Sequence, residues 1–127
     1  MSSEFAISDA QTDSHVALIR IAGRLDAKSA HRLFSHCREK IQGGHRRLII
    51  NLSQVSFVAS SGIGTLLALT EELKQVGGSL RLVELSEPVE SVVRLLNLVQ
   101  FLSIDASEDK ALEASRLIPQ SDRATAA

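Results

Sequence analysis

The sequence predicts an α/β domain, with a mixed β-sheet of about four to five strands packed with about four helices. Its 127 residues are 44% hydrophobic and 23% charged, a composition typical of one globular domain and not of disordered or fibrous chains. Short runs of branched apolar residues alternate with longer segments in which apolar residues recur every three or four positions. Strands separated by helices pair in parallel through right-handed crossovers. The first two strands lie too close together for a crossover, so we expect them to pair antiparallel.

The first half of the chain is predicted to contain three strands and one helix. Branched apolar residues predict strands over residues 5–7 and 15–22, with a polar turn over 8–14 between them. The helix spans residues 27–41, where apolar residues share one face, and Gly43-Gly44 stops it. A buried strand follows over residues 47–52, and residues 55–58 extend or flank it.

The second half is predicted to add two strands and three helices. A helix runs from Ser61 to Val76, with Ser60 or Ser61 as its cap and Gly77-Gly78 as its left-handed stop. Residues 79–84 alternate as a strand, and Pro88 opens a third helix whose apolar residues include Val89, Val92, Val93 and Leu96. A short strand over 101–104 and a final helix over 105–117 complete the domain.

Charge and composition exclude several classes of partner. The formal charge is -1, so we expect neither direct nucleic-acid binding nor attraction to an anionic membrane. The four Phe residues (Phe5, Phe34, Phe57, Phe101) are dispersed, and we interpret them as core residues. A lone cysteine, Cys37, cannot form an intramolecular disulfide, and the sequence contains neither a signal peptide core nor a membrane span. We therefore expect a cytoplasmic protein.

Residues that could carry enzyme chemistry are few. The histidines and Cys37 lack metal-ligand spacing, so we predict no metal site and no cofactor. A serine nucleophile at Ser60 or Ser61 would lack the Gly-x-Ser-x-Gly frame, and no histidine follows His45, which excludes the Ser…Asp…His order of hydrolases. We predict that the protein is not an enzyme.

The turn before the second predicted helix has an unusual content of small and hydroxyl residues. It reads Val58-Ala-Ser-Ser-Gly-Ile-Gly-Thr65. Free N–H groups and the helix dipole would favour a negative group on either serine by ~0.3–1 kcal/mol, and the glycines leave a flat surface that another backbone can approach. The alternative interpretation is structural: the serines cap the helix, and small residues let it pack closely on the sheet.

The sequence resembles the STAS domains, and among them the bacterial anti-sigma factor antagonists, over about residues 5–112. The resemblance rests on the order and spacing of several segments: Gly23-Arg-Leu-Asp26, Leu48-Ile-Ile-Asn-Leu52, Val55-Ser-Phe57, Ser60-Ser-Gly-Ile-Gly64, Gly77-Gly78, Leu80-Arg-Leu-Val83, Leu95-Leu-Asn-Leu98 and Phe101. It implies a single STAS-like domain over residues 1–117, and we expect residues 118–127 to form a flexible C-terminal tail.

In that family the motif reads Asp-Ser-Ser/Thr-Gly, and the serine after the Asp is phosphorylated by a partner that is both anti-sigma factor and serine kinase. The unphosphorylated antagonist binds this partner and frees a sigma factor, whereas the phosphorylated form is released. Carried over by position, the resemblance makes Ser60 the phosphoacceptor. The partner-binding surface it implies comprises Asp26, Ala59, Ser60, Ser61, Gly62 and Gly64.

The sequence departs from the family pattern at Ala59, which stands where the Asp is usual. Loss of this carboxylate weakens recognition by the kinase, removes a hydrogen bond that orients the serine hydroxyl, or eases the repulsion that a phosphate would meet. The alternative function is a constitutive STAS subunit of a stress-signalling scaffold or a lipid-transport ABC complex. A small enzyme or nucleotide-binding protein is a third hypothesis, and phosphate on Ser61, Thr65 or Ser56 and a weak homodimer both stay open. We interpret Leu95, Leu96 and Leu98 as core residues, not as an exposed docking patch.

Overall fold

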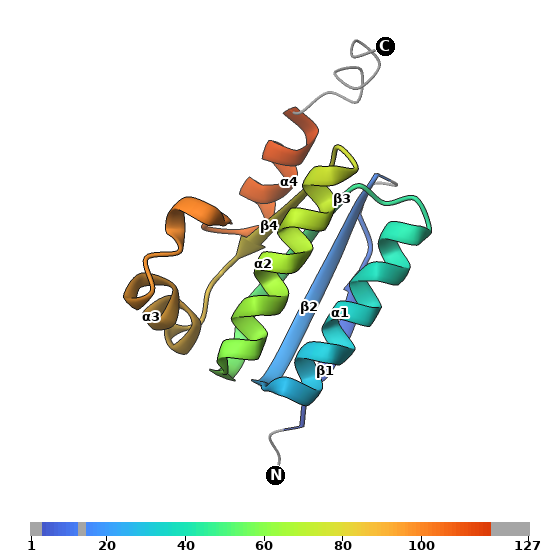
Figure 1. The fold of residues 1–127 in the computed structure, drawn as a ribbon. Helices are drawn as coiled ribbons and strands as arrows, with labels where there is room; N and C mark the ends of the chain where they lie inside the picture. The colour runs from blue at the N-terminus through green and yellow to red at the C-terminus, as the bar shows by residue number, and fades with distance from the viewer. Residues whose placement is uncertain (1–3, 13–14, 118–127) are drawn as a thin grey trace.

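A five-stranded mixed sheet forms the centre of the molecule in the computed structural model, which describes residues 4–12 and 15–117 (Figure 1). The tail predicted over 118–127 lies outside the described residues. The strands follow one another across the sheet in chain order, and they are β1 (Ala6–Ala10), β2 (Val16–Leu25), β3 (Arg47–Val58), β4 (Ser79–Val83) and β5 (Ser103–Asp105). β1 pairs antiparallel with β2, and every later pair is parallel. The predicted fold class is confirmed, including the direction of the first pair.

Three helices join successive parallel strands as crossovers: α1 (Ala27–Gln42), α2 (Ser60–Gln75) and α3 (Glu87–Leu95), the last followed by a 3-10 turn η1 (Val99–Phe101) before β5. The fourth helix, α4 (Glu108–Leu117), follows β5. α1 and α2 lie side by side on one face of the sheet (Figure 1). Alternate strand residues such as Ile19 and Ile50 join the large core beneath them, while their neighbours Leu18 and Ile49 join a smaller core with Ala111 of α4. Because successive strand side chains point to opposite faces, α4 covers the other side of the sheet.

β3 is the central strand, and its first six residues, Arg47–Leu52, are all buried. Four of these six residues are apolar, and burial without alternation is typical of a strand covered on both faces. The residues over 55–58 continue the same strand and do not form a separate one. This extension carries the chain to the start of α2.

Several predicted boundaries differ from the structure. β2 continues to Leu25, three residues beyond its predicted end, because residues 23–25 still pair with β3. β1 extends to Ala10, where the sequence predicted a turn, because residues 6–10 pair with residues 18–22 of β2 and an edge strand tolerates exposed polar side chains. The last strand begins at Ser103, since Phe101 belongs to η1. The final helix begins at Glu108, three residues later than predicted.

The end of α2 is a glycine stop, as predicted. Gly77 has a φ of 78°, a left-handed conformation that glycine adopts without a side-chain penalty. The N–H of Gly78 donates to the carbonyl of Leu73 over 2.6 Å and satisfies one of the last helical carbonyls. The chain then turns directly into β4.

Two sequence interpretations of buried side chains are wrong. Phe57 and Phe101 are 37% and 57% exposed, although Phe5 and Phe34 do pack against the core. Leu95 and Leu96 are 82% and 51% exposed, so of the three leucines predicted to be core only Leu98 packs there. α3 is too short to bury more than one face, and no other described segment covers the far side of its C-terminal turn.

Candidate functional site

The two strand-to-helix junctions that carry the predicted site residues lie next to each other. β2 and β3 are parallel neighbours, and Leu25 at the end of β2 pairs with Val58 at the end of β3. The N–H of Ala59 donates to the carbonyl of Leu25 over 2.9 Å, which ties the start of α2 to the start of α1. The structure therefore brings Asp26 together with Ala59 and Ser60 at the carboxyl ends of β2 and β3.

Asp26 is the N-cap of α1. Its Oδ1 accepts from the backbone N–H of Ser29 over 3.1 Å, and the hydroxyl oxygen of Ser29 accepts from the N–H of Asp26 over 2.8 Å. This reciprocal pair is a capping box. The backbone N–H of Ser29 and then its hydroxyl lower the pKa of Asp26, so the carboxylate is charged at neutral pH. The signal for this role was present in the sequence as an Asp three residues before a Ser.

The predicted cap of α2 is wrong. Ser60 and Ser61 occupy the first two helical positions, and the N-cap is Ala59, whose side chain accepts no hydrogen bond. The carbonyl of Ala59 does accept from the N–H groups of Gly62 and Ile63, at 2.9 and 3.2 Å. The unusual Ala59 therefore stands at the one position where an Asp side chain would cap this helix.

The hydroxyls of Ser60 and Ser61 are free to meet another molecule. Both residues are exposed, and among residues 4–12 and 15–117 neither hydroxyl has a hydrogen-bond partner. His15 and His45 precede β2 and β3 and so lie at the other end of these strands. Among the described residues, none lies within hydrogen-bond distance of the Ser60 hydroxyl to activate it as a nucleophile.

The two glycines of the motif differ in their surroundings. Gly62 is buried, and a Cβ built there would lie 2.8 Å from Cγ of Leu25 and 3.0 Å from its carbonyl oxygen. Gly64 is exposed, and a Cβ there would meet nothing within 4 Å. Gly62 thus allows α2 to approach β2 closely, while Gly64 belongs to the open surface beside the serines.

Two residues beside the site were missed by the sequence analysis. The guanidinium of Arg24 lies 4.1 Å from the ring centre of Phe57, so a cation stacks on a partly exposed aromatic ring next to the two junctions. A hollow of about 310 Å³ beside Asp26 is lined by Arg24 and by the start of α1, including Lys28 and Arg32. In the sequence, Arg24 and Phe57 stand near the ends of two segments that form neighbouring strands. The register of the sheet is needed to show that these two residues pair, so the sequence did not predict their stack.

Other kinds of site receive no support from the described residues. Over 4–12 and 15–117, no group of three or more His, Cys, Asp or Glu side chains is arranged to hold a metal ion. None of the helices in this part of the chain is long and apolar enough to cross a membrane.

Comparison with known proteins identifies the family. The model of the STAS domain matches residues 8–111, which include every element from within β1 to the first turn of α4. The chain belongs to the STAS domain family. The resemblance noted from the sequence is thereby confirmed.

Relatives of this STAS protein include anti-sigma factor antagonists. It is 33% identical to the anti-sigma F factor antagonist of Lysinibacillus sphaericus over 104 residues, which cover 78% of this chain and 85% of that protein. It is similar to the solved anti-sigma factor antagonist SpoIIAA in its unphosphorylated form, with a TM-score of 0.75, 26% identity, and coverage of 91% of this chain and 100% of that one. The structure of the Bacillus cell fate determinant SpoIIAA in its phosphorylated form matches with a TM-score of 0.68 and 25% identity, covering 86% and 98%.

Proposed function

We propose that this STAS protein is an anti-sigma factor antagonist that binds an anti-sigma factor with serine kinase activity and is released by phosphorylation of Ser60. The observation that carries the proposal is the exposed, unbonded hydroxyl of Ser60 at the start of α2, beside Asp26. Membership of the family and similarity to SpoIIAA, which is known in phosphorylated and unphosphorylated forms, support it. The protein acts by binding and performs no turnover of its own.

The binding surface consists of Asp26, Ala59, Ser60, Ser61 and Gly64, and Gly62 supports it from beneath. The exposed members carry small side chains, so a partner can approach the backbone closely. The Arg24–Phe57 stack adds an aromatic and cationic anchor of the kind that is enriched in interface hot spots.

Phosphorylation would act on this surface mainly by charge. It adds about -1.5 to -2 charges to a surface that the partner must cover. Burying such a charge in an interface costs several kcal/mol, and a penalty of ~4 kcal/mol weakens binding about a thousandfold. The favourable interaction with the dipole of α2 is only ~0.3–1 kcal/mol, so it cannot offset this loss. Release needs no change of fold.

The second candidate function, a constitutive subunit of a stress-signalling scaffold or of a lipid-transport ABC complex, is favoured by one observation. Ala59 occupies the N-cap of α2 without a side-chain cap, where family members carry an Asp. If this loss abolishes recognition by a kinase, the same surface would bind its partner permanently.

A pull-down from lysate of the source organism distinguishes the two functions. Wild type, Ser60→Ala and Ser60→Glu serve as baits, and bound proteins and phosphosites are read by mass spectrometry. The antagonist function predicts a kinase-like partner on wild type and Ser60→Ala that is lost with Ser60→Glu. The same large assembly on all three baits would reject the switch and support the constitutive subunit.

Ser61 provides the matched control, because it is also exposed and lies one position further into α2. We expect Ser61→Glu to weaken binding less than Ser60→Glu, and we expect Ser60→Ala alone to abolish phosphorylation by the captured kinase. Phosphate found on Ser61, Thr65 or Ser56 in its place would move the switch to that residue.

A further inference from the structure

The hollow at the start of α1 gathers basic side chains beside the proposed site. Its charged lining residues are three cations, Arg24, Lys28 and Arg32, and two carboxylates, Glu4 and Asp26. The three cations are exposed. The whole chain has a formal charge of -1, so the positive excess in this hollow runs against the overall charge balance.

No ion pair neutralises the three cations. Among residues 4–12 and 15–117, none of them pairs with a carboxylate, whereas five other basic side chains do: Arg20, Arg38, Lys40, Arg81 and Arg94. Of the two carboxylates in the hollow, Asp26 is engaged as the cap of α1, where its Oδ1 accepts from the N–H of Ser29. The cations are therefore available to an anion from another molecule.

The helix beside the hollow is basic along its length. α1 contains four basic residues, and its single acidic residue is Glu39. Two of the four, Arg38 and Lys40, form ion pairs with other elements. The cations without an ion pair, Lys28 and Arg32, lie in the first two turns of α1, on the side of the proposed site.

Aromatic rings hold two of the three cations in place. The guanidinium of Arg24 lies 4.1 Å from the ring centre of Phe57, and that of Arg32 lies 5.3 Å from the ring centre of Phe5. Arg32 also donates to the carbonyl of Phe5 over 3.3 Å. Stacking occupies the flat face of a guanidinium and leaves its in-plane N–H groups free for a carboxylate, which Arg binds with two parallel hydrogen bonds. Side chains that are already held lose less entropy on binding.

We propose that this hollow receives an acidic segment of the anti-sigma factor partner, with one carboxylate bound by Arg24 and further acidic side chains beside Lys28 and Arg32. The inference rests on the proposed function, because it names the chemistry of the same partner. Asp26 lines the hollow and also adjoins Ala59 of the proposed site, through the bond between the N–H of Ala59 and the carbonyl of Leu25. A partner that covers Ser60 therefore also reaches the cations.

A protein segment fits this hollow better than a nucleic acid does. Nucleic-acid binding draws on a broad basic surface, whereas the chain as a whole is slightly acidic and two carboxylates line the hollow itself. These carboxylates would repel the closely spaced phosphates of a nucleic-acid backbone. A peptide can place its acidic side chains singly, and its backbone N–H groups can donate to Glu4 and Asp26.

The charge of the hollow also bears on the proposed switch. An acidic segment bound here would lie near Ser60, and a phosphate on Ser60 would repel it. The same partner would thus be attracted to the unphosphorylated protein and repelled by the phosphorylated one.

NMR titration of the ¹⁵N-labelled full chain with a hexaglutamate peptide tests the hollow without the partner. We expect saturable shifts at the amides of residues 24–32 and at the Nε–Hε group of Arg24, with an affinity of about 1 mM, and no shifts with hexalysine. Lys28→Gln should weaken this binding about two- to fivefold. Lys28 makes no side-chain hydrogen bond among the described residues, so this variant should keep the unfolding midpoint of wild type.

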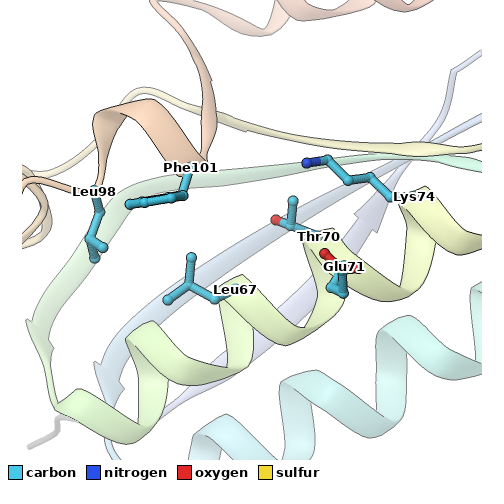
Figure 2. Close-up of a pocket in the computed structure, with 6 residues that line it drawn as sticks. All are labelled: Leu67, Thr70, Glu71, Lys74, Leu98 and Phe101. Carbon is cyan, nitrogen blue, oxygen red and sulfur yellow. The ribbon is translucent and has the colours of Figure 1, made fainter.

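Lys74→Gln is the matched control, because it removes the same charge from a different place. Lys74 lies in the last turn of α2, beside the groove between α2 and η1 (Figure 2). Ser60 lies at the other end of that helix. We expect Lys74→Gln to bind hexaglutamate as wild type does.

The pull-down partner provides the second test, with Arg24→Gln, Lys28→Gln and Lys74→Gln as baits. Arg24→Gln should weaken capture at least about tenfold, since it removes a charge-assisted hydrogen bond to a carboxylate. Capture by wild type should also fall as NaCl rises from about 50 to 500 mM, and the fall should be smaller for Arg24→Gln.

Three results would overturn this inference. The first is a hexaglutamate titration without shifts around the hollow. The second is a partner that Arg24→Gln and Lys28→Gln capture as strongly as Lys74→Gln does. The third is an oligothymidylate that binds the hollow more tightly than hexaglutamate, which would assign the cations to nucleic-acid phosphates.

Failure of this inference and failure of the proposed function give different results. A kinase-like partner lost with Ser60→Glu but indifferent to Arg24→Gln would reject the acidic segment and keep the switch. A partner weakened by Arg24→Gln but indifferent to Ser60→Glu would keep the acidic segment and reject the switch.

Discussion

The two glycines of the serine motif offer a sharp test of how α2 is seated on the sheet. We expect Gly62→Ala to destabilise the protein and Gly64→Ala to stabilise it, although both changes add one methyl group to the first turns of the same helix. At Gly62 the new Cβ would lie 2.8 Å from Cγ of Leu25, a side chain that is fully buried and cannot move aside freely. At Gly64 the new Cβ meets nothing within 4 Å.

The magnitudes follow from two opposing effects. Alanine is better than glycine in a helix by ~1 kcal/mol, and both variants gain from this. Overpacking a filled site costs ~1–3 kcal/mol, and only Gly62→Ala incurs it. We therefore expect a gain of ~0.5–1 kcal/mol for Gly64→Ala, a net loss of up to ~2 kcal/mol for Gly62→Ala, and a difference of ~1–3 kcal/mol between them.

Urea unfolding followed by circular dichroism measures both free energies of unfolding. Equal stability of the two variants, or a more stable Gly62→Ala, would show that Leu25 does not limit the approach of α2 and would refute the packing argument. If the argument holds, Gly62→Ala should also weaken binding of the captured partner more than Gly64→Ala, since displacing the start of α2 moves Ser60.

Three further outcomes are expected. Ala59→Asp should raise the free energy of unfolding by ~1 kcal/mol because the carboxylate would cap α2, and urea unfolding that shows no gain, with Ala59→Asn as the uncharged comparison, would contradict this. The hydrogen bonds from Arg20 lower the pKa of Glu108, partial burial opposes this effect, and Asn51 adds to the lowering. Stability from this carboxylate is therefore present above its unfolded pKa of ~4.3 and lost as the pH falls through the lower folded value. Glu108→Gln should lower the free energy of unfolding by no more than ~1 kcal/mol at pH 7, because Arg20 is half exposed, and should leave it unchanged in acid. A loss of stability that does not vary with pH in urea titrations would contradict this prediction. Burial, with a smaller contribution from Asp9, raises the pKa of Cys37 to about 12, so the native thiol should react with a disulfide reagent only at the rate of unfolding, and fast labelling of the folded protein would refute this.

Most of the fold could be predicted because its signals are local. Apolar periodicity located α1 and α2, and Gly77 marked the end of α2 because few other residues adopt its backbone conformation. The short distance between the first two strands predicted their antiparallel pairing correctly. The boundaries of β1 and β5 were missed because an edge strand is defined by its partner and only weakly by its own sequence.

The candidate site was predicted in part. The sequence placed Ser60 and Ser61 at the start of a helix, but it did not place Ala59 at the cap, since the first residue of a helix can shift by one or two positions without a change in the apolar pattern. The proximity of Asp26 to Ala59 and the Arg24–Phe57 stack depend on contacts between residues distant in the chain.

The sequence by itself determined the order of strands and helices, the parallel sheet after the first pair, and a serine at the start of α2. Only the tertiary structure decided that Asp26 meets Ala59, through the pairing of Leu25 with Val58, and that Leu95 remains exposed. The physical reason is that local backbone preferences and apolar periodicity belong to a segment, whereas burial and proximity depend on which other segment arrives to cover it.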